Sequence, residues 1–198
     1  TDFMRQIDSE QAPIEIAEKI ALLWQKHYKT SSVCVAVKTS IQSHALDVVT
    51  VNENSDSAIN IIEISPEEND KLLSFNHFKP LKAQTVAGWL TNYIDTSIDM
   101  NSASALPLII SDNITGLIIS NISIDQTKAN EMFGSACSIC AAVLALAESS
   151  VQQKQLSEKF AELISNLKTA RTQLAETNVL KAIAEMAAGA GHELNNPL

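Results

Sequence analysis

The sequence predicts an α+β fold in which an antiparallel sheet flanked by helices is followed by one long helix. Two observations indicate it. Runs rich in β-branched residues follow one another closely within the first 126 residues, which favours a meander over βαβ crossovers. From about Thr127 the helix formers Ala, Leu, Glu, Lys and Gln dominate, with no Pro between Pro107 and Pro197 and no Gly between Gly134 and Gly189.

The chain opens with a predicted helix and three predicted strands. Pro13 suits a first helical turn, and apolar residues then recur at helical spacing as far as Trp24. The β-branched runs that follow predict strands at 33–37, 46–51 and 59–64, with the polar residues 52–56 as a turn between the second and third.

The middle of the chain mixes helix and strand signals. Ser65 and Pro66, followed by two glutamates, predict a helix start with acidic groups near the positive end of the helix dipole. A second helical pattern covers 86–94. Two further strands are predicted at 106–110 and 116–122, joined by the turn-forming residues 112–116.

Composition narrows the class of protein. Hydrophobic residues make up 45% of the 198 residues, so the chain can bury a core, and its length suits one ordinary domain plus an extension or two small domains. The formal net charge of −9 and the lack of any run of Lys or Arg argue against nucleic acid or an anionic membrane surface as the main partner. Three cysteines, an odd number, indicate a reducing, cytoplasmic setting.

No segment predicts a membrane span. The longest apolar stretch, 136–147, is interrupted by Ser138 and is shorter than the ~20 residues that a spanning helix needs. The first residue is Thr1 rather than Met, and no signal peptide opens the chain. We therefore expect both ends to be cuts in a longer polypeptide.

The predicted long helix carries a coiled-coil seam, defined here by its apolar residues at 4-3-4-3 spacing. These are Leu156, Phe160, Leu163, Leu167, Ala170 and Leu174. The apolar track resumes at Leu180 and Ile183, so the register slips near Thr177. Such a helix would be roughly 100 Å long and could not bury its own stripe. We expect a parallel homodimer; the alternative is that the helix folds back on its own domain.

The last residues, 186–198, contain a run of small residues and then His192-Glu193-Leu194-Asn195-Asn196-Pro197-Leu198. This segment closely resembles the H-box of the dimerisation and phosphotransfer domain of two-component sensor histidine kinases. The resemblance implies that His192 is the phosphoacceptor. The unperturbed pKa of a histidine is ~6.5, so a neutral imidazole is available as a nucleophile near pH 7. A zinc-protease His-Glu-x-x-His reading is rejected because its fifth position is Asn196.

The same resemblance implies roles for two neighbours of His192 and for partners. Glu193 is expected to be the acid/base partner that holds the proton on the other ring nitrogen. Asn196, one helical turn on, is expected to position water for phosphatase activity. The family also needs ATP and Mg²⁺ on a separate catalytic domain and a response-regulator receiver domain as partner. These 198 residues contain no such catalytic domain, so we expect them to be inactive alone and to hold no cofactor.

The upstream region resembles a GAF-type sensor domain, through its order of helix, strand meander, helical excursions and long C-terminal helix. Three local segments are also similar to segments of that family: Val86-Ala87-Gly88-Trp89-Leu90, Leu106-Pro107-Leu108-Ile109-Ile110 and Thr115-Gly116-Leu117-Ile118-Ile119. A PAS domain is the rival. The resemblance implies a small-molecule site between the sheet and the helical excursions, but neither the cyclic-nucleotide nor the tetrapyrrole motif of such domains is present.

Several other residues have a functional and a structural interpretation. Trp89, Tyr93 and Phe78 would line a pocket, but aromatic residues in a small domain are usually core. His44 and His77 are expected in turns or on the surface. Cys137 and Cys140 form a C-x-x-C without a second pair, so we expect apolar packing rather than redox or metal chemistry.

These observations divide the chain into four segments. Residues 1–126 are expected to form the GAF-like sensor domain, and 127–150 its last helix. Residues 151–182 are the coiled-coil signalling helix, and 183–198 begin a histidine kinase phosphoacceptor domain. The predicted function is therefore sensory input and dimerisation for an ATP-dependent protein-histidine kinase. The alternative is a non-catalytic GAF or PAS ligand-binding and dimerisation module with a vestigial H-box.

Overall fold

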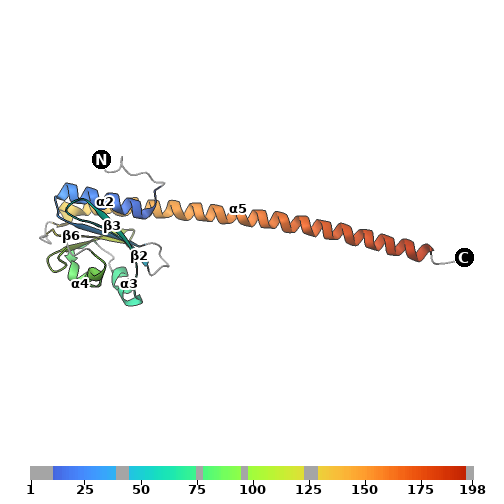
Figure 1. Cartoon of the computed structure of the whole chain (residues 1–198), viewed down its shortest axis with the longest axis horizontal. Coiled ribbons are helices and arrows are strands. Elements are labelled where there is room, and N and C mark those ends of the chain that lie inside the picture. The colour runs from blue at the N-terminus through green and yellow to red at the C-terminus, as the bar shows by residue number, and fades with distance from the viewer. Residues whose placement is uncertain (1–10, 39–44, 75–77, 95–97, 123–128, 195–198) are drawn as a thin grey trace. The chain divides into compact units, whose positions relative to one another are not determined.

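The computed structural model describes residues 11–38, 45–74, 78–94, 98–122 and 129–194, the last with backbone alone at 129–130 and 191–194 (Figure 1). The chain divides into two units, Thr1–Val151 and Gln152–Leu198, called here the N-terminal and C-terminal units. Its elements are α2 (Pro13–Tyr28), β1 (Val33–Lys38), β2 (Ala45–Val51), β3 (Ser57–Glu63), α3 (Pro66–Leu73), β4 (Leu81–Lys82), α4 (Ala83–Ala87), the 3₁₀ helix η1 (Gly88–Asn92), β5 (Ser104–Ile110), β6 (Asn113–Ser120) and α5 (Ala129–Leu194).

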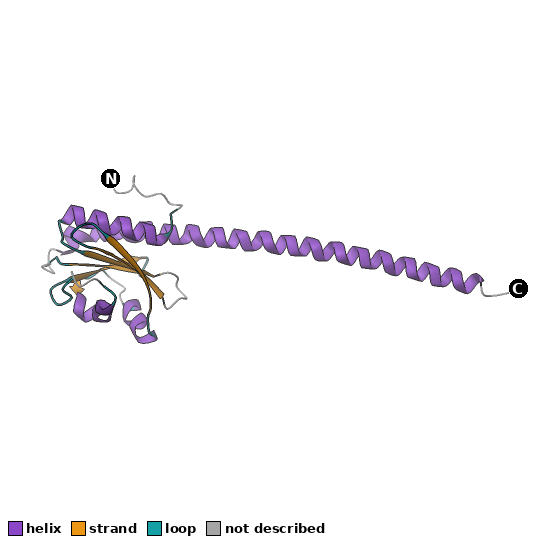
Figure 2. Cartoon of the chain, in the orientation of Figure 1, coloured by secondary structure: helices purple, strands orange, loops and turns teal. Residues whose placement is uncertain are grey.

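The N-terminal unit is built on a six-stranded antiparallel sheet in the order β3-β2-β1-β6-β5-β4 (Figure 2). In β1, Val35 pairs with Val49 of β2 on one side and Ile118 of β6 on the other. The meander β1-β2-β3 and the hairpin β5-β6 confirm the antiparallel sheet that the sequence predicted. The arrangement of an N-terminal helix, this sheet, helical excursions and α5 confirms the GAF-like α+β fold class.

Local sequence accounts for the helix boundaries. Pro13 occupies the first turn of α2, and Lys29 ends it in the left-handed conformation, with φ 51°. Ser65 and Glu68 form a capping box at the start of α3. The helix predicted over 86–94 is instead two short pieces, α4 and η1, and the two-residue strand β4 was not predicted.

Alternation along the strands gives two cores, one on each face of the sheet. The first core lies under α2 and the beginning of α5 and includes Val33, Val35, Ile20, Trp24 and Phe133. The second core lies under α3, α4 and η1 and includes Cys34, Ala36, Leu72, Val86 and Leu90. Both faces of the sheet are therefore covered, as Figure 1 shows for α2 on one side and α3 and α4 on the other.

Gln25 ties α2 to the ends of the neighbouring strands. Its Nε2 donates hydrogen bonds to the carbonyl oxygens of Ser31 at 3.0 Å and Asn52 at 2.5 Å, and Ser55 Oγ donates to its Oε1 at 3.2 Å. The buried Gln25 side chain thus forms hydrogen bonds with both the turn after α2 and the β2–β3 turn.

The C-terminal unit consists, in its described residues, of the remainder of α5. The helix continues to Leu194, and every side chain from 152 to 190 is exposed in the single chain. The division of the chain falls at Val151–Gln152, beside the predicted start of the coiled-coil segment.

Gly116 allows β6 to approach β1 closely, which gives a stability prediction. A Cβ at Gly116 would lie 2.5 Å from the carbonyl oxygen of Ala36, a backbone atom that cannot move aside. We expect Gly116→Ala to lower the free energy of unfolding by about 1–3 kcal/mol, measured by urea denaturation.

Gly88→Ala is the matched control for this test. A Cβ there would meet only the flexible end of the Gln84 side chain, at 3.3 Å. We expect a change within about 0.5 kcal/mol. Equal losses for the two variants would contradict the role given to the β1–β6 approach.

Candidate functional site

The segment that resembles an H-box lies at the end of α5. The backbone is helical through Leu194, so His192 and Glu193 lie on a helix. Their side chains, and the whole of Asn196 and Pro197, lie outside the described residues. The roles expected of His192, Glu193 and Asn196 therefore stay predictions.

The described residues before His192 leave the helix surface open. Side chains 186–190 are exposed, and a Cβ added at Gly189 would meet no atom within 4 Å. A glycine inside a helix costs about 1 kcal/mol relative to Ala. The helix therefore presents an open surface at Gly189, at a local cost in stability.

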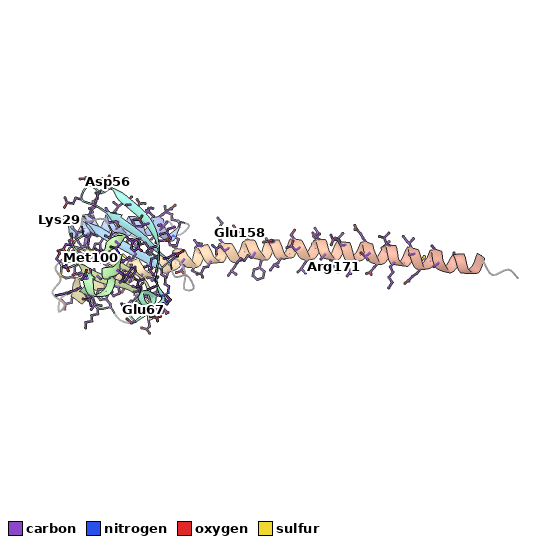
Figure 3. All side chains as sticks on the ribbon, turned by 60° about the horizontal axis from the view of Figure 1, so that its bottom comes forward. Lys29, Asp56, Glu67, Met100, Glu158 and Arg171 are labelled. Carbon is purple, nitrogen blue, oxygen red and sulfur yellow. The ribbon has the colours of Figure 1, made fainter. Side chains whose placement is uncertain are left out.

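Among the described residues, nothing covers the coiled-coil seam. Leu156, Phe160, Leu163, Leu167 and Leu174 are all exposed, and so are Leu180 and Ile183 beyond the slip. In Figure 3 the side chains of this part of α5, Glu158 and Arg171 among them, project from a bare helix. The salt bridge between Lys181 and Glu185, at 4.0 Å and well exposed, contributes little. In the part of the chain that the structure describes, no side chain buries any residue from 152 to 190.

One part of α5 is long and apolar enough to cross a membrane by length and composition alone. It lies within Glu131–Ala190, with a mean hydropathy of 1.6 over 18 residues, 39% of them buried inside the structure. A helix that packs one face in a protein core passes the same test.

The aromatic residues proposed for a ligand pocket do not converge. Phe78 packs against the first core, whereas Trp89 packs against the second. Tyr93 is exposed. The structure thus separates Phe78 from Trp89 by the sheet, because their segments lie on opposite faces. His44 and His77 lie outside the described residues.

Trp89, which packs against the second core, has a buried indole Nε1 without a hydrogen-bond partner among the described residues. The sequence pattern did not lead us to Asp47, a carboxylate that is buried in β2, where it pairs with Val37 of β1 and Ile61 of β3. The signal that could have found it is an acidic residue within a β-branched run.

Cys137 and Cys140 lie in the first core rather than at a reactive surface. They pack in the cluster that contains Trp24, Tyr28 and Phe133, whose rings lie 4.5 to 5.8 Å apart. Burial raises the pKa of Cys140 to about 12, and burial together with the neighbouring Cys140 raises the pKa of Cys137. Among the described residues, no three His, Cys, Asp or Glu side chains gather to hold a metal ion.

Comparison with known proteins gives likeness in fold only. No protein-family model matches the chain, and no curated protein does. Among solved structures, the GAF domain of an Acinetobacter phosphoenolpyruvate-protein phosphotransferase is similar at 12% identity and a TM-score of 0.46, over 75% of this chain and 91% of that one. The second GAF domain of DevS from Mycobacterium smegmatis is similar at 14% identity and a TM-score of 0.45, over 71% and 99%.

At these identities and TM-scores, the structural similarity gives no information about ligands or activity. The GAF-like fold class rests on the arrangement of this chain's own elements. In chemical terms, the described residues offer two apolar cores and an exposed helix that leads to His192.

The burial of the three cysteines gives a prediction of thiol reactivity. The thiolate is the reactive form, and at pH 8 a thiol with a pKa of about 12, such as Cys34 or Cys140, is roughly one part in ten thousand thiolate. We expect no reaction with a dithiobis-nitrobenzoate reagent in the folded protein and three equivalents of reaction in denaturant.

Ser165→Cys, which places a thiol on the exposed part of α5, is the control and should react at once without denaturant. Fast reaction of Cys137 or Cys140 in the native protein would show that the first core opens readily and would contradict a purely packing role.

Proposed function

We propose that the chain is the sensory and dimerisation region of a two-component sensor histidine kinase. In this proposal His192 accepts a phosphoryl group from ATP, bound with Mg²⁺ on a catalytic domain outside these residues, and passes it to the receiver domain of a response regulator. The observation that carries the proposal is the H-box-like sequence at the end of a continuous, exposed helix that also bears an uncovered coiled-coil seam.

The residue types at the end of α5 fit phosphoryl transfer. A neutral imidazole is a nucleophile near pH 7, and a carboxylate beside it can hold the proton of the other ring nitrogen. Glu193 is adjacent to His192, and Asn196 follows one turn later. Two proteins must approach the same histidine in turn, and the open surface at Gly189 leaves room for them.

The N-terminal unit is proposed as the input domain in the cytoplasm. A small molecule held between the sheet and the α3–α4 side is the proposed signal. The unpartnered Nε1 of Trp89, which packs against the second core on that side of the sheet, supports this, since a ligand there would find a hydrogen-bonding group within an apolar lining.

The proposal predicts phosphorylation at one histidine. The full-length protein, given γ-labelled ATP and Mg²⁺, should take up acid-labile, base-stable label, because phosphohistidine has that stability. We expect His192→Gln to abolish the label. His27→Gln, which changes an exposed histidine on α2, is the matched control and should leave labelling unchanged.

Label that persists in His192→Gln would remove His192 as the phosphoacceptor. Absence of any label in the wild-type full-length protein, with ATP bound, would favour the alternative, a ligand-binding and dimerisation module whose H-box is vestigial.

The proposal also predicts a homodimer. The chain, of 21.4 kDa, should sediment at twice that mass at micromolar concentration. Leu163→Glu places a charge in the coiled-coil seam and should weaken the dimer by about 3 kcal/mol, roughly a hundredfold in dissociation constant. Ser165→Glu, on the opposite side of the same helix, should leave the dimer intact. A monomeric wild-type chain would refute dimerisation through the seam.

A further inference from the structure

The part of α5 that belongs to the N-terminal unit exposes large apolar side chains at seven-residue intervals. Met132, Ile139 and Leu146 are 60%, 44% and 57% exposed. Three residues after each of them lie Ser135, Ala142 and Ser149, which are small and also exposed. These six residues are called here the outer stripe.

The opposite side of the same helix is buried. Cys137 and Leu144 lie in the first core, and so do Phe133, Cys140 and Ala147. In a heptad whose seam is formed by the outer stripe, Cys137 and Leu144 take the position farthest from that seam. The sheet therefore leaves the outer stripe free to meet another helix.

The outer stripe keeps the register of the coiled-coil seam. Counting by sevens from Leu146 passes through Gln153 to Phe160, Leu167 and Leu174. The same count from Ser149 leads to Leu156, Leu163 and Ala170. One heptad register thus runs without interruption from Met132 to Leu174, along a single helix.

The chemistry of the outer stripe favours a second copy of this chain over a charged partner. No charged residue occurs from 132 to 147. An exposed helix face of a soluble domain normally carries charges. Two copies in register would bring large side chains against large ones and small against small, layer by layer.

We propose that the homodimer interface begins at Met132 within the sensor domain, so that the outer stripe of each copy packs against that of the other in a parallel, in-register pair. This inference rests on the dimer of the proposed function and extends it. It makes α5 the element shared by the first core and the dimer interface, so a change in that core acts directly on the pairing of the two chains.

Disulfide trapping in the 198-residue chain tests the proposal. Ile139→Cys and Leu146→Cys should each form a covalent dimer on mild oxidation at least ~100-fold faster than Glu67→Cys, because the partner's thiol is held nearby at a high effective concentration. Glu67 is exposed on α3 (Figure 3), and α3 packs on the other face of the sheet from α2 and the beginning of α5 (Figure 1). The native cysteines give little background, since all three are buried.

Leu163→Cys, in the coiled-coil seam, separates this inference from the proposed function. Trapping at 139, 146 and 163 supports the proposal. Trapping at 163 but not at 139 or 146 overturns it and leaves the dimer standing. Failure at all three positions, with a monomer in sedimentation, overturns both. Circular dichroism of each variant confirms that the fold is retained.

Two other occupants of the outer stripe are distinguished in the same experiment. Flotation of the wild-type chain with phosphatidylcholine–phosphatidylglycerol vesicles, without trapping at 146, would assign the stripe to a lipid surface and overturn the proposal. Trapping between Ile139→Cys and Ala142→Cys chains in a mixed sample, but not between like positions, would indicate an antiparallel pair, in which the two different seam positions face each other, and overturn it as well.

Discussion

Helix α5 is apolar on two sides, and the sheet covers only one of them. The side with Cys137 and Leu144 is buried in the first core, whereas Met132, Ile139 and Leu146 face away from it, followed in the same register by the coiled-coil seam. Water does not stabilise so long an apolar stripe, and a lone helix gains nothing by exposing it. The proposed assembly, in which His192 lies at the end of a paired helix, depends on covering that second side.

The sheet explains why the N-terminal unit can hold α5 on one face and still keep a separate core on the other. Alternate residues of β1 point to opposite faces, Val33 and Val35 to one and Cys34 and Ala36 to the other. A ligand on the α3–α4 side would therefore act through the strands on the residues that pack against α5. Close β1–β6 approach at Gly116 makes the sheet a tight layer between the two cores.

The chemistry proposed for the C-terminal segment needs exposure more than it needs a prebuilt pocket. A phosphoacceptor must meet a nucleotide-bearing domain and then a receiver domain, so it is best carried on a helix surface without bulky neighbours. The open surface at Gly189 and the exposed side chains at 186–190 provide this. The buried cysteines, with raised pKa values, supply no competing nucleophile among the described residues of the N-terminal unit.

The sequence by itself determined the α+β class, the start of α2 at Pro13, the main strands and the seam from Leu156 to Leu174, because β-branched runs, caps and heptad spacing are local signals. It also supplied every residue of the proposed phosphoacceptor site. Tertiary structure alone decided that Phe78 and Trp89 lie on opposite faces, that the 86–94 region splits into α4 and η1, and that Asp47 is buried. It also decided which apolar residues of α5 the sheet covers. The sequence does not distinguish an apolar side chain that packs in the core of its own domain from one that is exposed on the outer side of the helix. Only the position of the sheet distinguishes the two.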